Sequence, residues 1–122
     1  MPRAKRPAPC PEKASLQERA SMTTEEAIQV ESLFSVLAND SRLRLIHEIA
    51  RHYEICTSDL AAAVEMKPQA VSNQLQRLQD KGIVGRRRDG NNALYRIVDN
   101  CVLILLERGL CLVEESAKRA NG

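Results

Sequence analysis

Aromatic residues are scarce in this sequence. Among its 122 residues there is no Trp, one Phe (Phe34) and two Tyr. Proteins that bind single-stranded nucleic acid stack the bases on aromatic side chains. The scarcity therefore excludes a stacking platform, and any nucleic-acid partner of this protein is expected to be a duplex.

Long apolar runs are also missing. The longest, Val102–Leu106, is far too short to cross a bilayer, so we expect no membrane partner. The N-terminus has no apolar segment of the kind that directs secretion, which predicts a cytoplasmic protein. In that compartment the four cysteines are expected to start reduced.

Recognisable catalytic patterns are absent from the sequence as well. It offers no Ser-His-Asp set, no glycine-rich phosphate loop and no carboxylate pair flanking a pocket. No two cysteines form a Cys-x-x-Cys pair, which excludes a zinc ribbon. We therefore expect neither an enzyme nor an organic cofactor. With 43% hydrophobic and 28% charged residues, the composition is that of one folded domain.

Positive charge is concentrated in one part of the chain. Residues 67–96 carry seven Lys or Arg against two acidic residues, whereas residues 14–66 carry four against nine. A basic block within an otherwise acidic domain indicates a polyanionic partner, although a solvated charged face would give the same count. The elements predicted within the block decide between these two interpretations.

The first part of the chain is predicted to be an arm followed by two helices. Residues 1–22, rich in proline and basic residues, form a flexible arm with a helical turn near 15–20. A capping box at Thr23–Glu26 opens a helix that runs to about residue 38, and Asp40 caps a second helix that ends near His52. Apolar residues on one face of the first helix are Ala27, Val30, Phe34 and Leu37.

The middle of the chain has the outline of a helix-turn-helix. Thr57 caps a short helix over residues 58–65, with Leu60 and Val64 facing inward. A tight turn follows, and Pro68 opens a longer helix that stops at Gly82. A short helix, a tight turn and a longer helix together make this motif, and its second helix, the reading helix, lies within the basic block.

A hairpin and a last helix complete the predicted domain, residues 23–118. After the reading helix the hydrophobic period changes from about 3.6 to 2, and residues 89–92 have the composition of a hairpin tip. A basic hairpin in this place is a wing. Asp99 caps the last helix, which runs to about Lys118 and leaves residues 119–122 as a tail. Its apolar stripe consists of Leu103, Leu106, Leu110 and Val113.

The exposed side of the reading helix carries groups that suit the major groove of DNA. Gln and Asn pair with adenine, Arg with guanine, Ala meets the thymine methyl group, and Ser takes a phosphate or base edge. The wing adds arginines for phosphates or the minor groove. The predicted DNA-binding residues are Gln69, Ala70, Ser72, Asn73, Gln74, Arg77, Arg86, Arg87, Arg88 and Asn91. Because one small domain makes few contacts, a homodimer on double-stranded operator DNA is implied.

Four motifs, taken in order, resemble the ArsR/SmtB family of metal-responsive winged-helix repressors. They are Leu37-Ala38-Asn39-Asp40-Ser41-Arg42-Leu43-Arg44, Glu54-Ile55-Cys56-Thr57-Ser58-Asp59-Leu60, Val71-Ser72-Asn73-Gln74-Leu75 and, at the end of the wing, Leu94-Tyr95. The resemblance implies a mainly α-helical winged helix-turn-helix with five helices and a small β-hairpin. It also implies a homodimer joined through the first and last helices, which represses an operon and leaves its operator when an inducer binds.

The resemblance further implies an inducer site at the start of the third helix. There Cys56 stands where the family's metal box has its first cysteine, and Ser58 replaces the second. Family sites at this position recruit cysteines from the N-terminal arm, which points to Cys10. Thiolates favour soft ions, so the inducer expected is a thiophilic metal or metalloid such as arsenite, antimonite, cadmium, lead or mercury.

The family's other inducer site lies on the last helix, as Asp-x-His followed downstream by His-x-x-Glu. Here Asp99 and Glu115 remain, Cys101 replaces the first His, Leu112 replaces the second, and Cys111 stands one position before Leu112. Ten residues of helix separate the two cysteines by about 15 Å, so a site that uses both needs two subunits. The candidate metal ligands are therefore Cys56, Cys10, Cys101 and Cys111, against the alternative that each is a small packed or inert residue. His47 is interpreted as a packed or surface imidazole.

Two other functions compete with metal-induced release. The same repressor fold would sense thiol oxidation or persulfide if two cysteines formed a bridge, and dithiothreitol would then reverse the release of DNA. A winged helix that binds only proteins would lack the steep dependence of DNA affinity on salt concentration that phosphate contacts produce.

Overall fold

The computed structural model describes residues 11–121 of the chain; the first part of the predicted arm, including Cys10, lies outside the described residues. The elements in chain order are α1 (Thr24–Leu37), α2 (Asp40–His52), β1 (Ile55–Cys56), α3 (Thr57–Val64), α4 (Pro68–Asp80), β2 (Val84–Asp89), β3 (Asn92–Ile97) and α5 (Asn100–Asn121). This order of five helices with a hairpin before the last one confirms the predicted winged helix-turn-helix.

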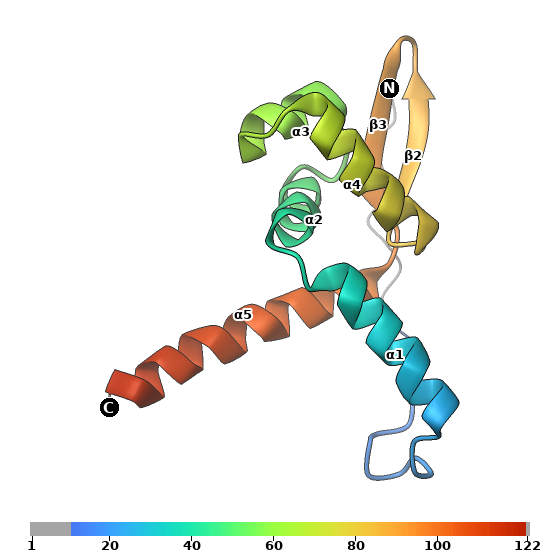
Figure 1. Ribbon diagram of the computed structural model, residues 1–122, viewed down its shortest axis with the longest axis vertical. Helices are drawn as coiled ribbons and strands as arrows, with labels where there is room; N and C mark the ends of the chain where they lie inside the picture. The colour runs from blue at the N-terminus through green and yellow to red at the C-terminus, as the bar shows by residue number, and fades with distance from the viewer. Residues whose placement is uncertain (1–10, 122) are drawn as a thin grey trace.

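The core forms where α2, α3 and α4 pack against one face of the sheet. In Figure 1 these helices lie beside the hairpin, whereas α1 and α5 extend away from it. The largest fully buried side chains come from α2, α3 and α4 and from the turn before β2: Leu45, Ile46, Ile49, Leu60, Val71, Leu75, Leu78 and Ile83. Leu75 and Leu78 are thus buried on the inner side of the reading helix, as the helical period predicts.

Local capping follows the sequence with two corrections. Thr23 caps α1 in the predicted box, its Oγ1 accepting from Glu26 N–H at 3.1 Å. The cap of α2 is Asn39, not Asp40: Asn39 has extended backbone angles and its Oδ1 accepts from Arg42 N–H at 3.0 Å, so Asp40 is already helical. Likewise Thr57 is the first residue of α3 and Cys56 is its cap, because the helix starts directly after β1.

The sheet has the order β1-β3-β2 and is antiparallel throughout. The predicted hairpin is confirmed: β2 and β3 pair from Val84 with Ile97 to Asp89 with Asn92, and Gly90 takes a positive φ of 64° in the two-residue loop between them. The two-residue strand β1 pairs with Leu94 and Tyr95 in the middle of β3. The sequence did not indicate β1 because two residues are too few to show a period.

The last helix is longer than predicted and starts as predicted. Asp99 Oδ1 accepts from Cys101 N–H at 2.9 Å, and α5 then runs to Asn121 instead of ending near Lys118. Within residues 11–121 no helix is both long and apolar enough to cross a membrane. Together α1 and α5 form the sides of a hydrophobic groove of about 410 Å³, here called the apolar groove. Its lining residues are Phe34, Leu37, Ala38, Leu43, Ile46, Val102, Leu105, Leu106, Gly109, Leu110 and Val113.

Candidate nucleic-acid interface and thiol sites

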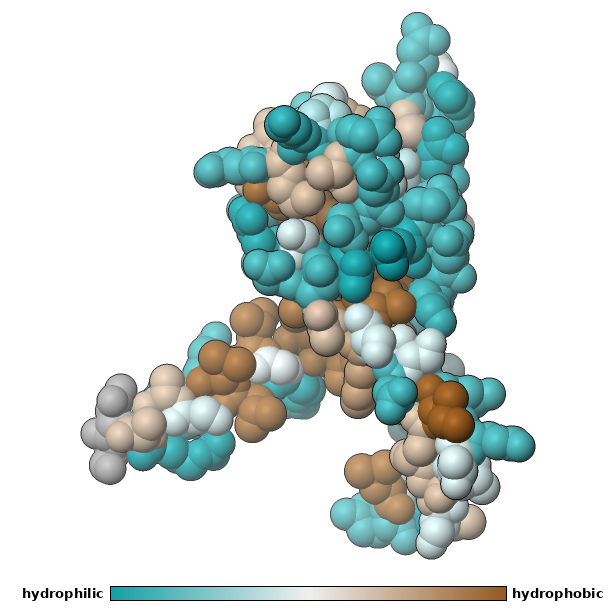
Figure 2. Space-filling view, viewed as in Figure 1, coloured by the Kyte–Doolittle hydropathy of each residue, from teal (hydrophilic) through white to brown (hydrophobic). Residues whose placement is uncertain are grey.

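The outer side of α4 is polar and accessible. Gln69, Asn73 and Arg77 are exposed there. Ala70, Ser72 and Gln74 are half-buried at the edges of this face. Figure 2 shows that hydrophilic residues cover the surface over α4 and the hairpin. The six groups predicted to read bases thus belong to one helix whose opposite side is anchored in the core.

Three of these side chains have an amide group that is hydrogen-bonded to a neighbour. Gln69 Nε2 donates to Asn73 Oδ1 at 3.1 Å, one helical turn away. Gln74 Oε1 accepts from Arg42 Nη1 at 2.8 Å, a contact across 32 residues of sequence that joins α2 to α4. Sequence reasoning used Arg42 only as part of a family motif, and nothing in the helical period indicated that it reaches the reading helix.

The three consecutive arginines of the wing point to two different faces of the hairpin. Successive residues of a strand point to opposite sides, so Arg86 and Arg88 share the face of Val84, which is buried against the helices. Both are exposed beyond the core, on the side of the sheet where α4 lies, and Asn91 is exposed at the tip. Arg87 points the other way. Its Nε and Nη2 donate to the two carboxylate oxygens of Glu54 at 2.7 and 2.6 Å.

Cys56 lies between the start of α3 and the wing. Its half-buried Sγ is 3.3 Å from Ser58 Oγ. Together with Ser58, Pro68, Arg88 and Asn91 it lines a polar pocket of about 310 Å³. Cys56 therefore lines the same pocket as the residue that opens the reading helix and an arginine of the wing.

The other described cysteines, Cys101 and Cys111, are both exposed on α5, and neither lines the apolar groove. Within one chain, residues 11–121 place no three His, Cys, Asp or Glu side chains together as a metal site would need.

Comparison with known proteins shows which family the chain belongs to. The model of the MarR family matches residues 39–93, which span α2 to the start of β3. A transcriptional repressor SmtB homolog from Synechocystis sp. is 41% identical over 95 residues, which are 78% of this chain and 71% of the relative. The chain belongs to the ArsR/SmtB family of winged-helix transcriptional repressors.

Other members of the family are similar over most of their length. The crystal structure of the AntR antimony-specific transcriptional repressor has 60% sequence identity and a TM-score of 0.77, covering 89% of this chain and 98% of that one. The cadmium resistance transcriptional regulatory protein CadC of Listeria innocua serovar 6a is 29% identical over 70% of this chain and 72% of its own. The winged-helix fold of this ArsR/SmtB repressor thus agrees with that of a solved relative.

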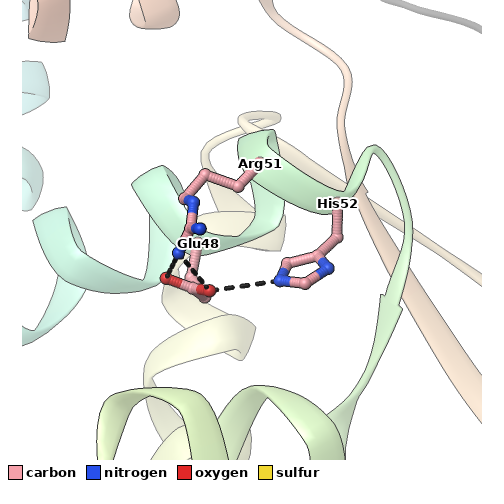
Figure 3. Close-up of polar contacts among 3 residues, drawn as sticks. All are labelled: Glu48, Arg51 and His52. Carbon is pink, nitrogen blue, oxygen red and sulfur yellow. Dashed lines mark hydrogen bonds and ion pairs between the residues drawn. The ribbon is translucent and has the colours of Figure 1, made fainter.

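The two histidines of this repressor lie on the surface of α2. His47 is exposed, in agreement with its interpretation as a surface imidazole. His52 Nε2 lies 3.1 Å from Glu48 Oε1, which also accepts from Arg51 at 3.1 Å (Figure 3). Burial of Glu48 acts to raise its pKa, but the hydrogen bonds from His52 and Arg51 outweigh this and lower it. These three residues lie within the last five residues of α2.

The ion pair between Glu54 and Arg87 ties the wing to the segment before β1. Hydrogen bonds from Arg87 lower the pKa of the Glu54 carboxyl below its ordinary value of 4.5, against an opposing effect of burial, and Arg96 lowers it further. A carboxyl whose pKa is lower in the folded protein stabilises the fold at pH values above the pKa that it has in the unfolded chain. This stabilisation is lost as the pH falls through the pKa of the folded state.

Replacing Glu54 with Gln is therefore expected to lower the free energy of unfolding by about 1 kcal/mol at pH 7, because it removes a two-point, partly buried ion pair. The difference from wild type should shrink as the pH falls from 4.5, the ordinary pKa of the carboxyl, through the lower pKa that it has in the folded protein. Urea denaturation at pH 7 and pH 3 measures both values, with Glu107→Gln on the exposed side of α5 as control. Equal stability losses at the two pH values would contradict this role of the ion pair.

Proposed function

We propose that this repressor works as a homodimer, binds double-stranded operator DNA through α4 and the wing, and releases the operator when a thiophilic metal or metalloid ion binds its cysteine thiolates. The observation that carries the DNA-binding part is the polar outer face of α4 beside Arg86 and Arg88 on one side of the molecule. Groove-compatible amides next to phosphate-binding arginines are what operator recognition requires.

The apolar groove supports the homodimer. Phe34 on α1 is 48% exposed in the single chain, and Leu110 and Val113 on α5 are 47% and 68% exposed. Figure 2 shows hydrophobic residues gathered along α5 and on α1. Burying such a continuous apolar surface is favourable, and a second copy of the same helices offers a matching one. Two reading helices would then be available for two half-sites.

The thiols support a soft ion as the inducer. The names of two relatives state antimony for AntR and cadmium resistance for CadC, and both are soft ions that thiolates bind well. The proposed ligands are drawn from Cys56, Cys10, Cys101 and Cys111. Cys56 is the first choice, because it lines the pocket that Arg88 of the wing and Pro68 at the start of the reading helix also line.

A ligand can change DNA affinity only if it binds better to the conformation that does not fit the operator. An ion held at Cys56 has a direct means to do this, because Ser58, Pro68 and Arg88 line the same pocket. Drawing a second thiolate to this point would shift the wing relative to α4. The two surfaces that contact DNA would then no longer match one half-site together.

Operator release by a panel of ions tests this function. We expect antimonite, arsenite, cadmium, lead or mercury, but not magnesium, to lower the operator affinity of reduced protein at least tenfold, and Cys56→Ser to abolish that response while binding DNA like wild type. Fluorescence anisotropy with labelled operator measures both. Each of Cys10, Cys101 and Cys111 is changed singly to Ser in parallel.

Three outcomes would contradict parts of the proposal. Undiminished release of Cys56→Ser by every ion would remove that residue from the mechanism. Undiminished release of all four single variants, with a variant lacking all four cysteines also released, would remove thiolate binding. Release by oxidants alone, reversed by dithiothreitol with a change in protein mass, would replace the ion with thiol oxidation.

A further inference from the structure

Gln74 has a fixed orientation before any DNA is bound. Its half-buried side chain lies at the edge of the outer face of α4, and its Oε1 accepts from Arg42 Nη1 at 2.8 Å. A guanidinium has five N–H donors and no acceptor, so the amide atom that faces Arg42 has to be the oxygen. The amide Nε2 of Gln74 is consequently directed away from Arg42.

Arg42 itself is held by the end of α1. Its Nε donates to Val36 O at 2.5 Å and its Nη2 to Ser35 O at 3.4 Å. These carbonyls belong to the last turn of α1, where helix geometry leaves acceptors without intrahelical donors and where α1 has no basic residue of its own. The backbone N–H of Arg42 is also fixed by Asn39 Oδ1. The fold therefore sets the guanidinium position, and DNA does not.

We infer that Arg42 is a positioning residue that determines which bases Gln74 accepts. This inference rests on the proposed function. With Nε2 directed outward, Gln74 presents a hydrogen-bond donor to the groove, and adenine, guanine and thymine all offer an acceptor there. Because Oε1 faces Arg42, the groove meets the donor of Gln74 and not its acceptor. Cytosine offers only its N4 donor, and Gln74 rejects it at that position.

A free glutamine could turn its amide around and accept from cytosine, whereas one held by Arg42 cannot. The expected consequence is depletion of cytosine by about tenfold at one position of each half-site, within the range measured for good base contacts. Arg42 touches no base in this arrangement and acts only through Gln74.

Selection of bound sequences from random DNA duplexes, with full-length protein, tests the inference. Wild type should select a palindrome with cytosine depleted at one symmetric pair of positions. Arg42→Met should lose that depletion and keep the preferences at all other positions. Gln74→Glu keeps Arg42 paired but offers only acceptors, so it should enrich cytosine at the same position. Arg44→Met, an exposed residue of the same helix, is the matched control and should select like wild type.

The outcomes separate this inference from the function on which it rests. Arg42→Met also removes donors from the last turn of α1, and thermal denaturation followed by circular dichroism shows whether it stays folded. If it does not, Gln74→Glu still tests whether residue 74 contacts that base, since it leaves those donors in place. An unchanged preference in folded Arg42→Met, or a Gln74→Glu profile identical to wild type, would overturn the role of Arg42. Failure of wild type to select any sequence would instead overturn operator binding itself.

Discussion

Replacing Leu110 with Glu is expected to convert the protein to monomers and to weaken operator binding about 100- to 1000-fold. Leu110 lines the apolar groove between α1 and α5 and is 47% exposed in the single chain. In a symmetric dimer the substitution occurs twice in one interface, so two carboxylates would be buried against leucine, valine and phenylalanine side chains. A cost of a few kcal/mol corresponds to the stated loss of affinity.

Size-exclusion chromatography with light scattering measures the oligomeric state, and anisotropy with labelled operator measures the affinity. Arg108→Gln is the matched control, because Arg108 is exposed on α5 and does not line the groove. Circular dichroism verifies that both variants are folded. A Leu110→Glu protein that remains dimeric would show that another surface joins the subunits.

The second large effect concerns the arginines of the wing. Replacing Arg86 and Arg88 together with Ala should weaken operator binding about 100- to 1000-fold at physiological salt and reduce the slope of log affinity against log salt by about 3 to 4. The reason is that a dimer would lose four phosphate contacts, each of which releases about one counterion. Both side chains are exposed on the side of the sheet that carries α4.

Arg87→Ala is the matched control for this prediction. Its guanidinium is held by both oxygens of Glu54 on the opposite face of the hairpin, so the salt slope should stay within about one of the wild-type value. This variant should lose stability instead. A salt slope that falls equally for Arg87→Ala and for Arg86→Ala would show that the ion pair opens on DNA and that all three arginines contact phosphates.

Much of the fold could be predicted from short-range patterns. Thr23 with Glu26, Pro68, Gly82 and Asp99 define helix ends through chemistry that acts within a few residues. The change of period after Gly82 indicated the hairpin. The errors are also local: Asn39 and Asp40 are both good caps, and only the backbone angles show which of them caps α2.

The candidate site was predictable only in part. The helical period separated Val71, Leu75 and Leu78 from the polar face of α4, which was enough to name the residues that we propose to face DNA. It could not assign the arginines of the wing, because Glu54 is distant in sequence and its pairing with Arg87 depends on how β1 joins the sheet. Arg42 escaped notice for the same reason, since its partner Gln74 lies 32 residues away.

The sequence by itself determined the elements, their order, the charge of residues 67–96 and the chemical groups available for bases, phosphates and soft ions. These properties depend on composition and on contacts between near neighbours. Only the tertiary structure decided which arginines remain accessible, which way Gln74 faces, that Cys56 meets the wing and that α1 and α5 enclose an apolar groove. Each of these depends on packing between segments far apart in the chain, and no local pattern encodes that geometry.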